Sequence, residues 1–392
     1  MRRTLLPPLS QIRVIAVCFA LLLLCSCATE NSACPSLPAD ASVNTSAGRD
    51  DNLFVKLHLE NGKDLLFALD TGSPGTLLDN SLEPELGKRI GTRRLHFGWF
   101  PNILANKYKS PKLYLGNTCL ELGDSVVTSD MQRMMSGRPE VAGILGMDCL
   151  RNYCIQLDFV SKKIYYIDPD NLHVENLGKP FPLAYIWGDL STRMDFCGKD
   201  VWFGLDTGDY SDGTLKSALL ERMKKAKIPA KVIDSKMESG ATERKYHFPE
   251  LALGGETYTN LVIHKQSDGL DANTLGLQFL ARHLVTLNFP KRTMYLKQTS
   301  VGPLVDEDLL SVMEFIKALG KNGQMPGLSK KDQWMMYHEP NPDAEVFAFR
   351  KVGDSSTFHY QFSRTSKDGS WKLEKAWRTD QSDKTMEEFP IP

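Results

Sequence analysis

One unit of this chain occurs twice, and this repetition limits the fold more than any other feature of the sequence. Asp70-Thr71-Gly72 ends one short apolar run, and Asp206-Thr207-Gly208 ends another, 136 residues later. Downstream of each motif, Ala142–Ile167 matches Ala272–Lys297 at its apolar positions, 130 residues apart. A strand-rich unit that recurs at a nearly fixed period predicts two copies of one fold packed together.

Both aspartates follow a sequence that is typical of a buried strand. The apolar runs are Leu65–Leu69 and Trp202–Leu205, and a turn-forming segment follows each of them. A carboxylate at the end of an apolar strand costs free energy unless it is paired, hydrogen-bonded or catalytic. A capping or turn-forming aspartate would explain one motif alone. Two motifs in matching contexts predict that Asp70 and Asp206 face each other.

The first 51 residues are typical of an export signal followed by a tether. A basic segment precedes the apolar run Val14–Leu24, which is short for a membrane span. Leu24-Cys25-Ser26-Cys27 resembles a bacterial lipoprotein processing site, which implies a signal over residues 1–27 and a lipid on Cys27. Cleavage near Ala28 and an uncleaved anchor are the alternatives. Residues 28–51 are rich in Ser, Ala, Asn and Pro, which predicts a flexible tether.

These features place the chain in the bacterial cell envelope, facing the periplasm or the cell surface, with its lipid in the membrane. The net charge of −1 provides no basic field for nucleic acid. Five cysteines remain after Cys27, so at least one thiol is unpaired or pairs outside the chain. The histidines and cysteines show no zinc-binding spacing, so we expect neither a metal nor a cofactor. The oligomeric state is left open.

The repeats and a distinct tail divide the rest of the chain. We assign residues 52–168 to the first repeat and 169–300 to the second, joined by a connection over Asp168–Pro182. The sequence between the first Asp-Thr-Gly motif and about Lys107 is polar and predicts irregular structure. Residues 301–392 predict a small α+β domain, in which Asp306 caps a helix that Gly320 stops. Three strands are expected after this helix, at Ala344–Lys351, Thr357–Arg364 and Ser370–Arg378.

Two Asp-Thr-Gly motifs, each with a downstream Leu-Gly, resemble the aspartic proteases over about Asn52–Lys297. Each unit resembles a retropepsin-like domain, and two units in one chain resemble pepsin-like enzymes and bacterial tandem retropepsin-like proteins. The resemblance implies a mainly β fold with two acid-protease lobes forming a bilobal pair of β-barrels. It also implies an aspartic endopeptidase, in which Asp70 and Asp206 activate water against an extended peptide or protein segment held between the lobes.

The resemblance also implies supporting roles for neighbouring residues. Thr71 and Thr207 would each reach across to the opposite lobe. Gly72 and Gly208 would permit a close approach and direct their backbone N–H groups at the carboxylates. The hydroxyl of Ser73 would donate a hydrogen bond to the outer oxygen of Asp70. The segments behind the two catalytic loops would be Ile144-Leu145-Gly146 and Thr274-Leu275-Gly276.

The sequence departs from the aspartic protease pattern at several points. Asp209 stands where Ser or Thr is usual, and it would either add charge beside the dyad or turn outward to cap its own loop. Thr274 replaces an aliphatic residue. The candidate flaps, which would close over substrate, are Phe97-Gly98-Trp99 in the first lobe and Ser239-Gly240-Ala241 in the second. Two alternatives therefore remain: a catalytically impaired module that binds peptides, and a surface scaffold whose working part is the tail.

Overall fold

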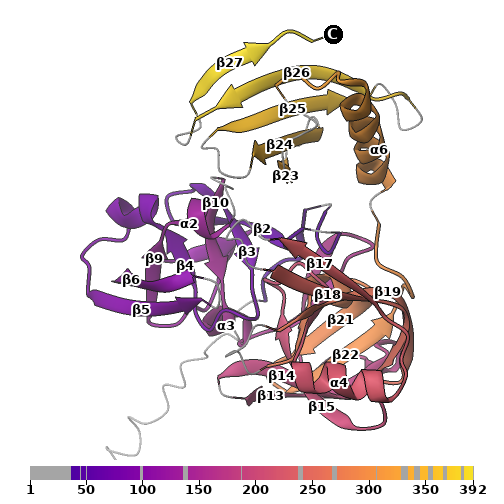
Figure 1. The fold of residues 1–392 in the computed structure, drawn as a ribbon. Helices are drawn as coiled ribbons and strands as arrows, with labels where there is room; N and C mark the ends of the chain where they lie inside the picture. The colour runs from indigo at the N-terminus through magenta and orange to yellow at the C-terminus, as the bar shows by residue number, and fades with distance from the viewer. Residues whose placement is uncertain are drawn as a thin grey trace, which may run out of the picture. The chain divides into compact units, whose positions relative to one another are not determined.

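The chain is mainly β, and the computed structural model describes it from residue 37 to residue 391 (Figure 1). The described residues lie almost entirely within one compact unit, Pro38–Pro392. The described residues do not include the predicted signal segment 1–27 with Cys27, nor Gly98, Trp99, Gly240 and Asp306. The positions omitted between 37 and 391 are 45, 50, 98–99, 136–139, 187, 237–241, 267–271, 306, 328–333, 340–344, 352–355, 365–368 and 381–383.

The first repeat builds a mixed sheet of nine strands, in the order β5-β6-β9-β4-β10-β3-β2-β7-β8. The strand Phe54–Leu59 alternates buried and more exposed side chains over most of its length, as a half-buried strand does. The central strand Val141–Leu145 is apolar on both faces, as a fully buried strand is. In chain order its elements are β2 (Phe54–Leu59), β3 (Asp64–Leu69), β4 (Leu77–Asp79), η1 (Asn80–Glu85), β5 (Gly91–Phe97), β6 (Phe100–Lys109), β7 (Leu113–Leu115), β8 (Thr118–Cys119), β9 (Ser125–Ser129), α2 (Met131–Met134) and β10 (Val141–Leu145).

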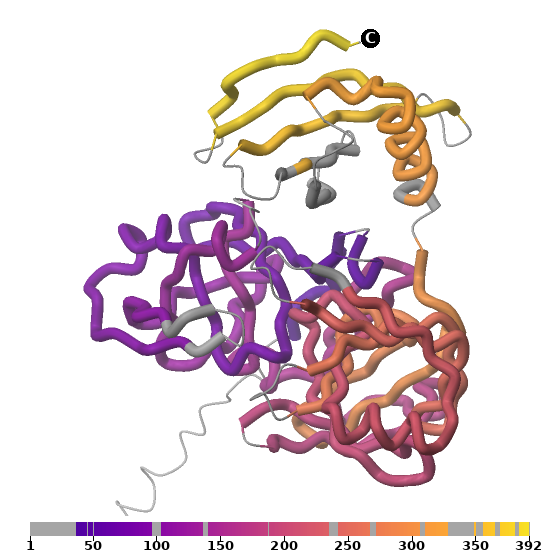
Figure 2. The backbone as a smooth tube through the Cα atoms, in the orientation of Figure 1, coloured from indigo at the N-terminus to yellow at the C-terminus, as the bar shows by residue number. Residues whose placement is uncertain are grey.

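A second mixed sheet has thirteen strands, in the order β1-β12-β11-β21-β22-β13-β14-β15-β20-β16-β19-β18-β17. Its path can be followed in the backbone tube (Figure 2). Closure of either sheet into a barrel remains a prediction. Its elements are β1 (Ala41–Ser42), α3 (Met147–Leu150), β11 (Cys154–Asp158), β12 (Lys163–Ile167), η2 (Val174–Asn176), β13 (Lys179–Ile186), β14 (Asp189–Asp195), β15 (Asp200–Asp206), β16 (Gly213–Leu215), α4 (Ser217–Lys225), β17 (Lys231–Lys236), β18 (Thr242–Leu253), β19 (Glu256–Lys265), β20 (Thr274–Gly276), α5 (Leu277–Leu280), β21 (His283–Asn288) and β22 (Thr293–Gln298).

The internal repeat is visible in the strand pairing. In the first repeat β3 pairs in parallel with β10, β10 pairs antiparallel with β4, and β4 pairs in parallel with β9. In the second repeat β15, β20, β16 and β19 follow the same sequence of parallel, antiparallel and parallel pairings. The repeated sequence therefore encodes a repeated topology, and each copy ends its central strand at an aspartate.

The two repeats share one sheet through the pairing of β11 with β21. These strands run antiparallel, with Gln156 opposite Thr286 and a side-chain hydrogen bond of 2.8 Å between them. One continuous hydrophobic core contains buried residues of both repeats, from Leu53 to Leu296. The repeats are thus joined by backbone hydrogen bonds and by a common core.

A fragment that ends at Asp168 should not behave as a stable monomer. It would keep β11 but lose β21, which leaves the edge of β11 unpaired and its side of the core open to water. We expect a dimer or an aggregate of residues 38–168 in size-exclusion chromatography with light scattering. A monodisperse monomer with native-like near-UV circular dichroism would contradict the shared core.

The C-terminal part contains α6 (Glu307–Asn322) and an antiparallel sheet of five strands. Its own core is built by α6 and the sheet, with Val312 and Ile316 packed near Tyr360 and Phe362. Gly320 does not stop the helix, which continues to Asn322 before Gly323 takes a positive φ of 72°. The strands of this sheet are β23 (Trp334–Glu339), β24 (Glu345–Lys351), β25 (Thr357–Ser363), β26 (Lys372–Thr379) and β27 (Thr385–Phe389). The sequence prediction missed β23 and β27.

Two other predictions about local structure were wrong. The polar sequence before Lys107 forms the long hairpin of β5 and β6 instead of irregular structure. The second half of the predicted tether is packed, because β1 pairs with β12 and Ala47 is 1% exposed. Ser46 donates a hydrogen bond of 2.6 Å to the buried carboxylate of Asp51, which fixes this segment further.

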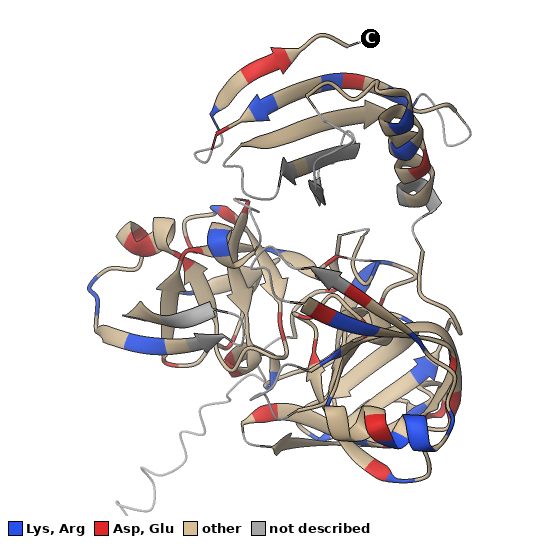
Figure 3. Cartoon of the chain, in the orientation of Figure 1, with Lys and Arg blue, Asp and Glu red and all other residues tan. Residues whose placement is uncertain are grey.

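Charges of both signs are distributed over the described elements (Figure 3). Among the helices in the described part, none is both long and apolar enough to cross a membrane. Four cysteines in that part are free thiols: Cys119, Cys149, Cys154 and Cys197.

Candidate active site

Two central strands deliver the two aspartates to the same place. β3 ends at Leu69, and the backbone N–H of Asp70 donates to the carbonyl of Leu145 on the neighbouring parallel strand at 3.0 Å. β15 ends at Asp206, which pairs with Gly276 on β20. Burial of the apolar residues on both strands fixes where each carboxylate emerges.

The carboxyl groups of Asp70 and Asp206 share a side-chain hydrogen bond. Each also receives two backbone N–H groups from its own loop. Gly72 and Ser73 donate to Oδ1 of Asp70 at 2.7 and 3.1 Å. Gly208 and Asp209 donate to Oδ1 of Asp206 at 3.0 and 3.1 Å. The two loops thus hold their carboxylates in equivalent ways, as the repeated motif predicts.

The two threonines bind across the junction between the loops. The hydroxyl of Thr71 donates to the carbonyl of Leu205 at 2.8 Å, and that of Thr207 donates to the carbonyl of Leu69 at 2.8 Å. Each hydroxyl also accepts the backbone N–H of the other threonine, at 2.9 and 3.1 Å. Both side chains are buried, so these four bonds form without competition from water and keep the loops in one relative position.

The two glycines allow each loop to approach the carboxyl of the other. A Cβ atom added to Gly72 would lie 2.5 Å from Oδ1 of Asp206, and one added to Gly208 would lie 2.6 Å from Cγ of Asp70. Real Cβ contacts are essentially never closer than 3.0 Å. Any larger residue at either position would therefore push the two aspartates apart.

The protonation behaviour of the pair follows from this packing. Burial raises the pKa of Asp70, although the N–H of Gly72 opposes that shift. The pKa of Asp206 lies well above its usual range, because of burial first and then the negative charges of Asp70 and Asp209. The hydrogen bond between the carboxyls lowers the pKa of Asp70 and raises that of Asp206. A single proton held on Asp206 and directed at Asp70 satisfies both trends.

The residues after each glycine differ from the sequence prediction. The hydroxyl of Ser73 donates to the carbonyl of Gly75 at 2.8 Å, so only the backbone N–H of Ser73 binds Asp70. That carbonyl lies only two residues further along the same turn. The carboxylate of Asp209 accepts the backbone N–H of Ser211 at 2.9 Å, and its charge also raises the pKa of Asp206. Asp209 therefore caps its own loop and acts on the dyad.

The strand-to-helix turns behind the two loops repeat as well. Met147 N–H donates to the carbonyl of Ser73 at 2.9 Å, and Leu277 N–H donates to that of Asp209 at 2.6 Å. These bonds place α3 and α5 directly behind the aspartate loops. The Leu-Gly segments of the two repeats therefore lie behind the aspartate loops and support them.

Asn52 contacts the site, and no feature of the sequence had singled it out. Its side-chain Nδ2 donates to the carbonyl of Gly208 at 2.9 Å, so a residue of the first repeat supports the loop of the second. A single asparagine before a strand carries no recognisable pattern, and the strand register of the second repeat has Asp189 at the equivalent position. Only the three-dimensional structure could identify this contact.

The flap candidates Gly98, Trp99 and Gly240 lie outside the described residues. The strands on either side of them pair as hairpins, β5 with β6 and β17 with β18. A hollow of about 330 Å³ occurs in the first repeat, and neither Asp70 nor Asp206 lines it. In the described part of the chain, no group of three or more His, Cys, Asp or Glu residues could hold a metal ion.

Comparisons with known proteins return matches among solved structures alone. No protein-family model matches the sequence, and no curated protein matches it either. Among solved structures, the chain is similar to basic 7S globulin from soybean, with a TM-score of 0.42 and 11% sequence identity. The match covers 68% of this chain and 96% of that one. At this score and identity we infer neither the fold nor the function from it.

Proposed function

We propose that this chain is an aspartic-type endopeptidase with two retropepsin-like lobes. One observation supports the proposal above all, the geometry of the pair: each carboxylate accepts two backbone N–H groups, and a Cβ added to Gly72 or Gly208 would collide with the aspartate of the other loop. Two adjacent carboxyls that hold one proton are the arrangement that activates water for peptide hydrolysis. As the sequence indicates, export and a lipid on Cys27 belong to this proposal, and mass spectrometry of the mature N-terminus tests them.

In the proposed reaction the two carboxyls have different roles. Asp70, whose pKa is the less raised of the two, is ionised and takes a proton from water that attacks the peptide carbonyl. Asp206, whose pKa is raised well above its usual range, holds the shared proton and donates it to the carbonyl oxygen. Collapse of the tetrahedral adduct passes a proton to the leaving amine, and no covalent bond to the protein forms. Substrate would enter as an extended segment and reach the dyad from the side on which the Asp70 and Asp206 residues keep some exposed surface.

A second candidate is a module that binds peptides without cleaving them. The observation that favours it is Asp209, whose negative charge lies close enough to raise the pKa of Asp206. A third carboxylate beside the dyad makes Asp206 a weaker acid, and Asp206 would then transfer its proton to the substrate carbonyl less readily. Binding of an extended peptide needs only the two aspartate loops and the surface around them, so it would survive a silent dyad.

The direct test incubates purified protein lacking residues 1–27 with a denatured protein mixture from pH 3 to pH 7. A parallel sample contains an inhibitor that mimics the tetrahedral transition state of aspartic proteases. We expect peptide products, seen by mass spectrometry, which disappear in the inhibited sample. Inhibitor binding by calorimetry without products would favour the binding module, and the absence of both would contradict each candidate.

Replacing Asp209 by Ser should move the pH dependence of cleavage. The substitution removes a negative charge that raises the pKa of Asp206, so the pKa of the shared proton should fall. The limb of the pH–rate profile that reports loss of this proton should therefore move to lower pH. If the parent is inactive, Asp209→Ser should gain activity at mildly acidic pH. An unchanged profile would show that Asp209 serves only as the cap of Ser211.

A further inference from the structure

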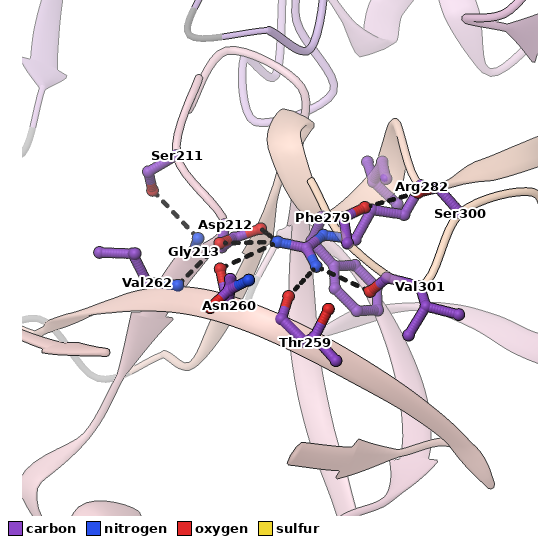
Figure 4. A network of polar contacts seen from close by, with 12 residues as sticks. Ser211, Asp212, Gly213, Thr259, Asn260, Val262, Phe279, Arg282, Ser300 and Val301 are labelled. Carbon is purple, nitrogen blue, oxygen red and sulfur yellow. Dashed lines mark hydrogen bonds and ion pairs between the residues drawn. The ribbon is translucent and has the colours of Figure 1, made fainter. Parts of the chain in front are cut away.

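A buried ion pair lies directly behind the loop that carries Asp206 (Figure 4). Asp212 is 1% exposed and Arg282 is fully buried. Nη2 of Arg282 contacts both carboxylate oxygens of Asp212, at 3.0 and 3.2 Å. Moving two charges out of water is costly, and such pairs persist where further hydrogen bonds complete their surroundings.

Asp212 ties the end of the Asp206 loop to two strands. Its Oδ2 accepts the backbone N–H of Val262 on β19 at 2.8 Å, and its carbonyl accepts the N–H of Gly276 on β20 at 3.1 Å. The preceding carbonyl, that of Ser211, accepts the N–H of Gln278 at 3.1 Å. The loop from Asp206 to Asp212 is therefore anchored at both ends, with the N–H donors of Gly208 and Asp209 between the anchors.

Arg282 extends this anchor to other segments. Nη1 donates to the carbonyl of Thr259 at 2.7 Å and to that of Val301 at 3.1 Å, and Nη2 approaches the carbonyl of Asn260 at 3.4 Å. Its own carbonyl accepts the N–H groups of Thr299 and Ser300, at 2.9 and 3.1 Å. One guanidinium thus joins the aspartate loop, β19 and the chain that leaves the second repeat.

The first repeat anchors its aspartate loop without an ion pair at the equivalent positions. Thr76 occupies the position equivalent to Asp212, and Asn152 that equivalent to Arg282. The hydroxyl of Thr76 accepts the N–H of Gly146 at 3.3 Å and donates to Asp148 at 2.7 Å. The topology shared by the repeats therefore does not require an ion pair. Because the ion pair occurs behind Asp206 and not behind Asp70, a local feature of the second repeat must account for it.

We propose that Asp212 and Arg282 are positioning residues for the second carboxylate of the dyad. They fix the loop so that Gly208 and Asp209 present their N–H groups to Asp206. The guanidinium of Arg282 balances the carboxylate of Asp212, which lies six residues after Asp206. This inference rests on the proposed function, because it assigns a role within the same site.

The test compares Arg282→Met, Asp212→Asn and the double variant in the full-length chain purified in detergent. Arg193→Met is the matched control, since it removes an exposed ion pair of the same repeat, to Asp200 at 3.1 Å. We expect each single variant to lower kcat on the order of 100-fold with little change in KM, because the loop is displaced and not the substrate surface. The control should keep its parent kcat.

The pH dependence separates positioning from simple loss of stability. Arg282→Met leaves an unbalanced negative charge near Asp206, so the limb reporting loss of the shared proton should move to higher pH. Asp212→Asn leaves an unbalanced positive charge, so the same limb should move to lower pH, and the double variant should return towards the parent. Shifts in the same direction, or loss of thermal stability with an unmoved limb, would overturn the proposal.

A second measurement keeps the inference independent of turnover. Carboxyl ¹³C shifts of labelled aspartate, with Asp206→Asn for assignment, follow the titration of Asp206 directly. If the parent cleaves no peptide, the proposed function fails, while opposite titration shifts in the two single variants still support the positioning role. If Arg282→Met does not fold, Asp212→Asn against the Arg193→Met control decides the outcome, because it retains a side chain of the same shape.

Discussion

Asp70→Asn and Asp206→Asn should each reduce peptide cleavage by on the order of 10³- to 10⁴-fold, and the double variant should lose little more. The reason is that one proton serves both carboxyls through their shared hydrogen bond, so either substitution removes the base and acid together. Steady-state kinetics on a fluorogenic peptide, at the pH optimum of the parent, measures the effect. Multiplicative losses in the double variant would show that the aspartates act independently.

The stability of these variants provides the control for folding. Burial raises the pKa values of both aspartates, and the negative charge of Asp70 raises that of Asp206 further, so the folded protein binds this proton more tightly than the unfolded chain does. The contribution of the pair is thus fully present at low pH and is lost as the pH rises through the raised pKa values. Asn carries no charge, so both variants should be at least as stable as the parent near neutral pH. A large fall in the melting temperature would mean that lost activity reports lost structure.

Gly208→Ala should lower kcat on the order of 100-fold or more. The added Cβ would lie 2.6 Å from Cγ of Asp70, so the carboxyl or the loop must move, and the hydrogen bond between the aspartates would be broken. Gly72→Ala should behave in the same way, because its Cβ would meet Asp206 at 2.5 Å. The measurement is kcat and KM for the two variants, together with their melting temperatures.

Gly91→Ala is the matched control for these substitutions. No heavy atom lies within 4 Å of a Cβ added to Gly91 at the start of β5, so the same change of side chain meets open space. Its activity and stability should equal those of the parent. If Gly208→Ala also kept full activity, the close approach of the two loops could not be essential to catalysis.

The sequence predicted those parts of the fold that repeat or alternate in hydrophobicity. The two Asp-Thr-Gly motifs indicated that Asp70 and Asp206 meet, and the structure brings their carboxyls together. The hairpin of β5 and β6 was missed because much of β5 is exposed, as at Arg93 and Arg94, so it lacks a period-two pattern. β17 has the same character, with four exposed residues at its start. Hairpins whose two faces both meet water carry little signal in the sequence.

The polar contacts within the site were the hardest to predict. The hydroxyl of Ser73 has a choice between Asp70 and the carbonyl of Gly75, and only the conformation of the turn decides between them. Asp212 and Arg282 are 70 residues apart, and each resembles an ordinary charged residue of a loop or a helix end. Their burial follows from how the second repeat folds, which no local pattern reveals.

The pairing of β11 with β21 has a consequence for the chemistry of the dyad. Gln156 and Thr286 occupy the same position in the two repeats and lie opposite each other, so each strand pairs with its own copy about a local two-fold axis. In a dimer of separate identical chains, any substitution beside one carboxylate would also occur beside the other. Here both copies belong to one polypeptide, so Ser73 and Asp209 can differ while the symmetric junction is kept. Covalent linkage thereby lets a nearly symmetric scaffold give its two aspartates unequal proton affinities.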